Sequence, residues 1–133
     1  MRRFRSNRTH RQTVRRTHRR KYRALTWIWA LVGAVLLLVP GGDLPGAGLP
    51  EAVTTAVELG AHLAVFLALA YLAARGYGGS RSPKEWRSGV LAAVLAYCVL
   101  LEILQIAIPG RGFEFVDIAI GWLGAVLGFG RRG

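Results

Sequence analysis

Six polar residues interrupt the apolar part of this 133-residue chain and could do chemistry together. They are Glu58, His62, Glu102, Gln105, Arg111 and Asp117. Glu58 and His62 are four residues apart, and Glu102 and Gln105 are three apart, so each pair shares one face of a helix. We therefore expect Glu58 to lie close enough to contact His62, and Gln105 to fix hydrogen-bond geometry in the site.

These residue types favour acid–base chemistry beside an anionic group. His62, with the carboxylate of Glu58 next to it, is a candidate general acid or base. Glu102 and Asp117 are candidate proton carriers, and Asp117 could instead neutralise Arg111. The planar fork of Arg111 suits a phosphate or a carboxylate. No metal-ligand spacing such as His-Glu-x-x-His occurs, so we expect neither a metal nor a cofactor.

Four apolar segments position these residues. They cover residues 24–39, 55–77, 88–108 and 115–129. The first and third lack the polar stripe that a soluble helix bundle needs, and 53% of the chain is hydrophobic. The sequence predicts an all-α integral membrane bundle of four transmembrane helices. The first and last segments are short for a hydrocarbon core of about 30 Å, and flanking aromatic residues and Arg23 would absorb the mismatch.

Positive charge alternates with the apolar segments. Residues 1–23 contain eleven of the eighteen Lys and Arg residues, and the connection over 75–87 contains four. The connection after the first segment has none, and the one after the third has only Arg111. Because cytoplasmic loops carry an excess of Lys and Arg, both termini are predicted to be cytoplasmic in a multi-pass protein of the cell membrane.

The basic segment 1–23 lacks apolar periodicity and is predicted to be a disordered tail preceding a membrane domain over 24–130. We favour attraction to anionic lipids of the inner leaflet over specific nucleic-acid binding, because an apolar segment follows at once. A signal peptide is the alternative for the first apolar segment. Pro40 and the glycines after it do not form a small-x-small cleavage site.

This topology places all six polar residues at one depth. Segment two starts at the outer face, segment three ends there and segment four starts there, so the residues fall in the outer third of the bilayer. Ionisable residues inside membranes face the bundle and are functional candidates. A shared pocket is one explanation, and a buried polar network that fixes helix register is the other.

Small residues have a packing role in this interpretation. Gly121, Gly124 and Gly128 lie in the last segment, and the pair four apart is a small-xxx-small pattern for close helix contact. The single cysteine, Cys98, lies in an apolar run and is expected to be a packing residue. Association into a homo-oligomer is left open.

Three motifs in this order resemble the VanZ-like membrane family. They read "ELGAHLAVF", "LLEILQIAIPGR" and "DIAIGWLGAVLG", within residues 40–130. The resemblance assigns the family's motif positions to His62, Glu102, Gln105, Arg111, Asp117, Gly124 and Gly128. Glu58 stands where the family usually has Asp, and Gly121 stands where it usually has Asn. The resemblance implies a link to resistance to the glycopeptide antibiotic teicoplanin.

The working hypothesis is a pocket that binds, and acts on, an amphiphile with an anionic headgroup in the outer leaflet. Arg111 would hold the headgroup, while His62, Glu102 and Asp117 would handle protons. The rival is a non-catalytic binding or assembly protein whose polar network is structural. A proton-coupled transporter is less favoured, because the inner half of the bundle has no polar residue to complete a path.

Overall fold

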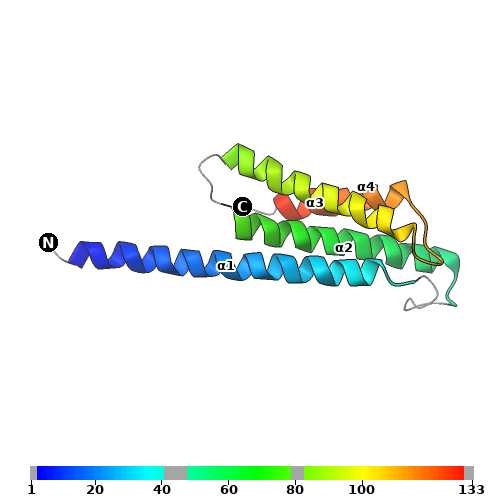
Figure 1. The fold of residues 1–133 in the computed structure, drawn as a ribbon, viewed down its shortest axis with the longest axis horizontal. Helices are drawn as coiled ribbons and strands as arrows, with labels where there is room; N and C mark the ends of the chain where they lie inside the picture. Colours follow the sequence, from blue (N-terminus) through cyan, green and yellow to red (C-terminus); the bar gives the residue numbers. More distant parts are fainter. Residues whose placement is uncertain (1–2, 41–47, 79–82, 131–133) are drawn as a thin grey trace.

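The structure is a computed structural model that describes residues 3–40, 48–78 and 83–130. This part of the chain contains four helices and no strand. They are α1 (Arg3–Leu37), α2 (Glu51–Tyr77), α3 (Pro83–Gln105) and α4 (Phe115–Gly130) (Figure 1). The helices run alternately up and down, so α2 and α4 are parallel (Figure 1). The all-helical prediction is confirmed for these residues.

Proline marks three of the helix boundaries. α1 ends at Leu37, three residues before Pro40, and Pro50 caps the start of α2. α3 begins at Pro83, where the absent amide hydrogen has no helical partner to lose. Gly110 adopts φ 75° between α3 and α4 and allows the tight turn there. The second and third helices therefore begin four to five residues earlier than the sequence predicts.

α1 is much longer than the apolar segment expected for it. The sequence predicts disorder for residues 1–23, whereas the structure continues α1 through this basic segment from Arg3 onward. No Pro or Gly lies between Arg3 and Ala30, and Arg, Lys and Gln are good helix formers. Helical structure can therefore extend outward from the packed part of α1.

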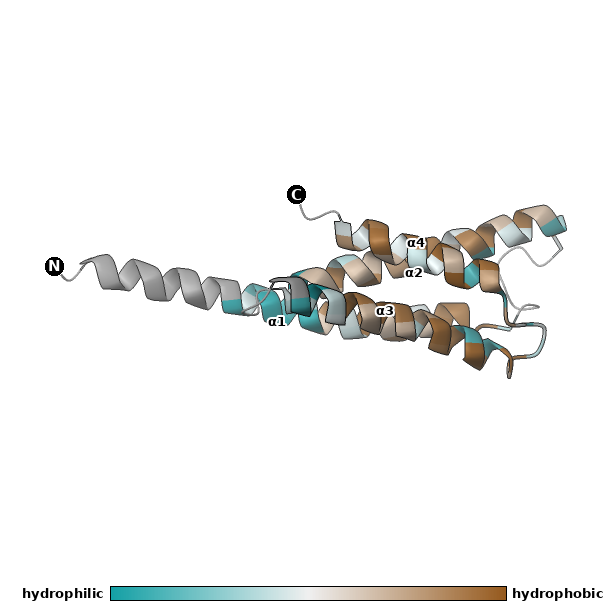
Figure 2. Cartoon of the chain, turned by 90° about the horizontal axis from the view of Figure 1, so that it is seen from above, coloured by the Kyte–Doolittle hydropathy of each residue, from teal (hydrophilic) through white to brown (hydrophobic). Residues whose placement is uncertain are grey.

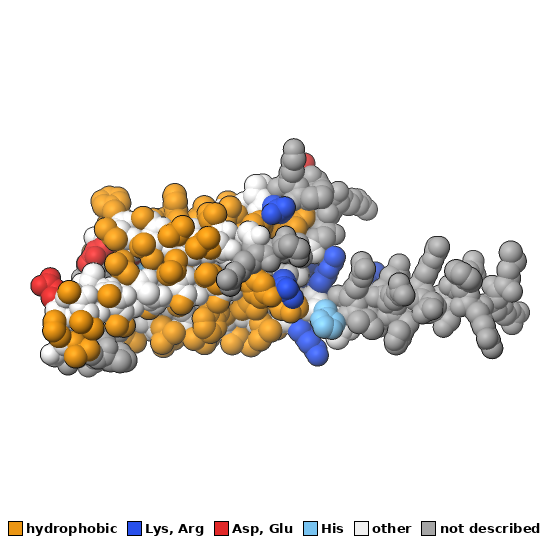
Figure 3. Space-filling model, turned by 180° about the vertical axis from the view of Figure 1, so that it is seen from behind, with side chains coloured by type: hydrophobic (Ala, Val, Ile, Leu, Met, Phe, Trp, Pro, Cys, Tyr) orange, Lys and Arg blue, Asp and Glu red, His pale blue; other side chains and the backbone are white. Residues whose placement is uncertain are grey.

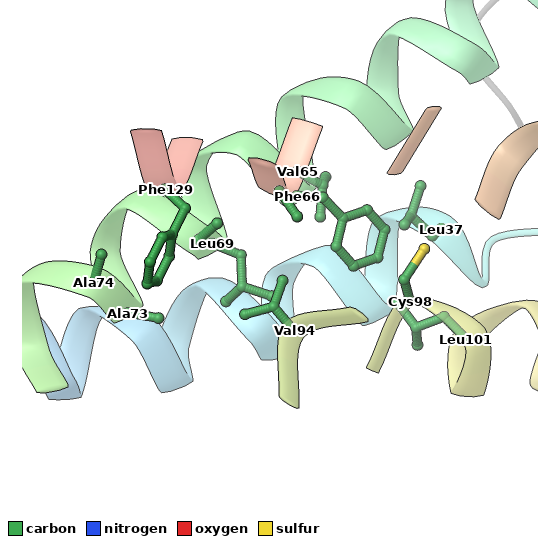
Figure 4. Close-up of a cluster of buried hydrophobic side chains, with 12 residues drawn as sticks. Leu37, Val65, Phe66, Leu69, Ala73, Ala74, Val94, Cys98, Leu101 and Phe129 are labelled. Carbon is green, nitrogen blue, oxygen red and sulfur yellow. The ribbon is translucent and has the colours of Figure 1, made fainter. Parts of the chain in front are cut away.

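The core lies where all four helices meet. Leu37 of α1, Phe66 of α2, Cys98 of α3 and Phe129 of α4 are buried, and Figure 4 shows them within one cluster of apolar side chains. Cys98 is only 1% exposed, which is consistent with a packing residue.

The outer faces of the bundle are also apolar. Trp27, Leu31, Ile103 and Val126 are among many large apolar side chains that are exposed, and brown apolar residues continue around the helices (Figure 2). α2 and the part of α3 over Glu85–Gln105 are long and apolar enough to cross a membrane, and α4 is shorter. This surface would be unusual in water.

Charge separates the two ends of this apolar surface. Lys and Arg side chains lie beside the basic segment of α1, and most acidic side chains in this view lie at the far end, with one near the basic residues (Figure 3). At the basic end Arg23 donates from Nε to the Gly76 carbonyl at 2.9 Å. Trp27 donates from Nε1 to the Tyr77 hydroxyl at 2.9 Å. These bonds fix α1 against the end of α2.

Candidate functional site

Three buried side chains from three helices meet near the acidic end of the bundle. The Nε2 atom of His62 lies 3.0 Å from Oε1 of Glu102 and 3.8 Å from Oδ2 of Asp117. His62 is 1% exposed, Glu102 0% and Asp117 5%. We call these three residues the polar cluster.

A layer of apolar contacts one helical turn away explains why the polar cluster forms. A Cβ atom added to Gly121 would lie 2.6 Å from Sγ of Cys98 and 2.9 Å from Cδ2 of Phe66, so these three residues touch. His62 precedes Phe66 by four residues, and Asp117 precedes Gly121 by four. α3 runs the opposite way, so Glu102, four residues after Cys98, points to the same level.

Glycine is what allows α2 and α4 to come so close. A Cβ atom on Gly124 would collide with the backbone carbonyl of Leu63, and one on Gly128 would collide with that of Leu67. Backbone atoms cannot yield to a larger residue as a flexible side chain can. In the structure, Gly124 and Gly128 lie where two helix backbones are too close for any side chain, which is the packing role predicted for them.

The ring of His62 is held at Nδ1 by a backbone carbonyl and at Nε2 by the Glu102 carboxylate. Its Nδ1 atom lies 3.0 Å from the carbonyl oxygen of Glu58, which can only accept, so Nδ1 carries a hydrogen and donates. The expectation that the Glu58 carboxylate orients His62 is not met. In a straight helix the backbone carbonyl of residue i−4 lies close to the side chain of residue i. The Glu58 carbonyl therefore takes the place next to the His62 ring that the Glu58 carboxylate was expected to take.

The carboxylate of Glu58 is instead paired with Arg111. Nη1 of Arg111 lies 3.3 Å from Oε1 of Glu58, and Nε donates to the Val39 carbonyl at 3.1 Å. Of the two roles that the sequence left open for Asp117, neutralising Arg111 is not seen in the structure, and Asp117 lies beside His62 in the polar cluster instead. The turn after α3 returns Arg111 toward α1 and α2, and this direction is not encoded in residue spacing.

The remaining predicted residue, Gln105, ties two helices together. Its Nε2 donates to the Leu37 carbonyl at 2.9 Å, and Gln105 is 1% exposed. Leu37 is the last residue of α1, where helix carbonyls lack intrahelical partners. Gln105 thus satisfies the end of α1.

Sequence reasoning missed every backbone partner of the site, the Glu114 amide among them, and one tyrosine. The second oxygen of Glu102 accepts from the Glu114 amide at 3.4 Å. The hydroxyl of Tyr97 donates to the Ala30 carbonyl at 2.6 Å and joins α3 to α1. Backbone partners carry no residue type and so give no signal, whereas a tyrosine in an apolar run could have been noticed.

A small cavity connects the exterior with the polar cluster. Its volume is about 50 Å³, and Glu58, His62 and Arg111 line it together with Thr54 and apolar residues of α1 and α2. The Glu58–Arg111 pair therefore lies on the route to His62. The cavity can admit water or a small polar group rather than a whole headgroup.

Comparison with known proteins identifies one family. The family model of VanZ/LLP1 matches residues 3–131. The match begins well before residue 40, so it includes the basic segment that the sequence resemblance left outside. No curated protein and no solved structure matches the chain.

Proposed function

The chain belongs to the VanZ/LLP1 family, and we propose that it is a multi-pass membrane protein that binds, and acts on, an amphiphile with an anionic headgroup. All four helices cross the bilayer in this proposal. The basic segment of α1, the start of α3 and the C-terminus face the cytoplasm, where they meet anionic lipids. The polar cluster then lies near the outer leaflet.

The membrane placement rests on the apolar exterior and the separation of charge. Exposed apolar side chains surround the bundle, and basic residues lie at one end (Figure 3). α4 has 16 residues, which span roughly 24 Å at 1.5 Å per residue. It is therefore short for the bilayer, and local thinning would bring the polar cluster closer to the headgroups.

Arg111 is the residue best placed to hold an anionic headgroup. A guanidinium has five N–H donors, and two of them bind Glu58 and the Val39 carbonyl. Because Arg111 lines the cavity, a phosphate or carboxylate arriving there can use the remaining donors and displace Glu58. Such an exchange keeps Arg111 paired, while the displaced Glu58 carboxylate, whose side chain is 27% exposed, turns to water.

An apolar groove offers room for the chain of the amphiphile. It has a volume of about 470 Å³ and lies between α1, α2 and α3, with Leu69 and Tyr97 in its wall. Leu69 lies seven residues from His62 on α2, and Tyr97 five residues from Glu102 on α3. The groove therefore begins roughly 7–10 Å from the polar cluster.

The observation that carries the proposal is the buried polar cluster behind the Glu58–Arg111 pair. His62 holds its ring through Nδ1 and presents Nε2 to two carboxylates. This arrangement can pass a proton to or from a group bound at Arg111, so modification of the headgroup is included in the proposal.

A second candidate is a non-catalytic protein whose polar residues only hold the bundle together. One observation favours it: among the described residues, no fully buried side-chain nitrogen or oxygen lacks a hydrogen-bond partner. The bond from Gln105 to Leu37 is of this structural kind. The test must therefore separate loss of binding from loss of folding.

Native mass spectrometry of the protein extracted with its own lipids tests the proposal. Wild type is compared with Arg111→Gln and His62→Gln, and Arg19→Gln is the matched control because it removes one exposed positive charge far from the cavity. Helical content of every variant is measured by circular dichroism. Teicoplanin susceptibility of cells expressing each variant reports on the link to resistance.

We expect one anionic lipid to remain bound to wild type and to Arg19→Gln. The same lipid should be lost from folded Arg111→Gln. A change in the mass of that lipid that depends on His62 indicates catalysis. If all four proteins carry the same mixed lipids and the site variants only unfold more readily, the structural candidate is correct instead.

A further inference from the structure

The polar cluster has an unbalanced charge. Among the described residues, the only basic side chain within ion-pair distance of Glu102 and Asp117 is His62. Arg111 is paired with Glu58. Two carboxylates and one singly charged imidazolium still sum to −1, and a buried uncompensated charge is costly in an apolar bundle.

The orientation of His62 adds an independent observation. Nδ1 donates its hydrogen to the carbonyl of Glu58, so neutral His62 has its lone pair on Nε2. That lone pair faces Oε1 of Glu102 at 3.0 Å, and a carboxylate oxygen also presents a lone pair. Two acceptors at this distance cannot face each other without a hydrogen or a metal ion between them. Histidines that bind metals commonly donate their other nitrogen to a backbone carbonyl in this way.

Asp117 points to the same conclusion. Its side chain is 7% exposed, and among the described residues its nearest charged partner is Nε2 of His62 at 3.8 Å. No hydrogen bond to its carboxylate is seen in the part of the chain that the structure describes. A nearly buried carboxylate thus faces the lone pair of His62 without a donor of its own.

The spacing of the three atoms fits a metal ion. Metal–ligand bonds of about 2.0–2.2 Å place neighbouring tetrahedral ligands roughly 3.4 Å apart. Nε2 of His62 lies 3.0 Å and 3.8 Å from the two carboxylate oxygens, and all three atoms lie within 4.8 Å of one another. His62 Nε2 is already close to this spacing from both oxygens, and the two carboxylate oxygens would move toward each other to complete the geometry.

From these observations we infer that His62, Glu102 and Asp117 form a binding site for a divalent transition-metal ion, of which Zn²⁺ is the best match. Nε2 of His62 and one oxygen from each carboxylate are the three protein ligands. The two carboxylates and neutral His62 then balance the two positive charges of the ion. The inference rests on this geometry and does not depend on an amphiphile being bound.

The surroundings of the cluster suit such a site. The backbone carbonyl of Glu58 orients His62, and the Glu114 amide holds the second oxygen of Glu102. The cavity of about 50 Å³ reaches His62 and provides a route for the ion. Three protein ligands leave a fourth position on the ion, which a water or a ligand oxygen can take. With the ion bound, both ring nitrogens of His62 are occupied, so that water would take over the proton transfer assigned to His62 in the proposed function.

Metal content and Co²⁺ binding test the inference without any lipid. Wild type and the near-isosteric variants Asp117→Asn and Glu102→Gln are purified without chelator and measured by inductively coupled plasma mass spectrometry. Glu114→Gln is the control, because its side chain is exposed and only its backbone touches the cluster. After removal of metal, Co²⁺ is titrated and its visible absorption gives affinity and geometry.

Wild type and Glu114→Gln should carry about one Zn²⁺ per chain and show the intense absorption of four-coordinate Co²⁺. Asp117→Asn should lose at least about tenfold in Co²⁺ affinity. The inference is overturned if folded wild type takes up no Zn²⁺ or Co²⁺, or if Asp117→Asn binds as well as wild type. The uptake of metal by wild type is measured on wild type alone, so misfolding of a variant does not prevent the test from deciding whether the site binds metal.

Discussion

Replacing Gly128 with alanine should loosen the contact between α2 and α4. The added Cβ would collide with the carbonyl oxygen of Leu67, and it would lie 3.0 Å from Leu67 Cα. These are backbone atoms of a helix, so relief requires α4 to move away from α2. Because the polar cluster depends on the same two helices, His62 and Asp117 would move apart as well.

The size of the effect follows from two opposing contributions. Overpacking a tight contact by one methyl group costs about 1–3 kcal/mol, while replacing Gly by Ala within a helix gains about 0.5–1 kcal/mol. Gly60 on α2 is the matched control, since a Cβ there meets nothing within 4 Å. Gly60→Ala should stabilise slightly, so the two variants should differ by about 1–3 kcal/mol.

The free energy of unfolding is measured by titrating detergent-solubilised protein with sodium dodecyl sulfate, with helical circular dichroism as the signal. Gly60→Ala corrects for helix propensity and for the added methyl group itself. If Gly128→Ala and Gly60→Ala unfold at the same detergent ratio, the close contact between α2 and α4 is not present in the protein, and the explanation for the polar cluster fails with it.

Three further predictions concern single contacts. Gln105→Leu should cost about 1–3 kcal/mol of unfolding free energy, because the Leu37 carbonyl loses its donor, and the same detergent titration measures it. Arg111→Lys should cost about 1 kcal/mol, since a single ammonium nitrogen does not reach both Glu58 and the Val39 carbonyl as the guanidinium fork does; recovery of wild-type stability with Lys would contradict this. Cys98, 1% exposed, should react with a maleimide at least about tenfold more slowly in the folded bundle than in denaturant, and equal rates would show that the core is open.

Much of the fold could be predicted from the sequence because apolar length and proline position are local properties. The fourth helix was expected over 115–129 and spans Phe115–Gly130. The second was expected to end at Tyr77 and does so. The helical basic segment of α1 was not predicted, since charge density alone says little about whether a chain without Gly or Pro continues an adjoining helix.

The site was harder to predict because partner choice is a tertiary property. Helical spacing shows that Glu58 and His62 share a face, but it does not say whether a side chain or a backbone carbonyl fills the contact. The rotation of each helix decides that, and the Gly121 contact with Phe66 and Cys98 sets it here. The alternation of helix directions was enough to place these residues at one level of the bundle. It was not enough to show that Glu58 pairs with Arg111 and that Asp117 lies beside His62.

Gly121, which stands where the VanZ-like family usually has Asn, shows how packing limits the polar groups near the site. The family resemblance predicts Asn at this position, one turn from Asp117. Here Sγ of Cys98 and the ring of Phe66 occupy the space where any Cβ would lie. An Asn could enter only if these two side chains moved, so the three positions must change together. The polar cluster of this chain therefore forms without that amide, and its partners beyond the three side chains are the backbone groups of Glu58 and Glu114.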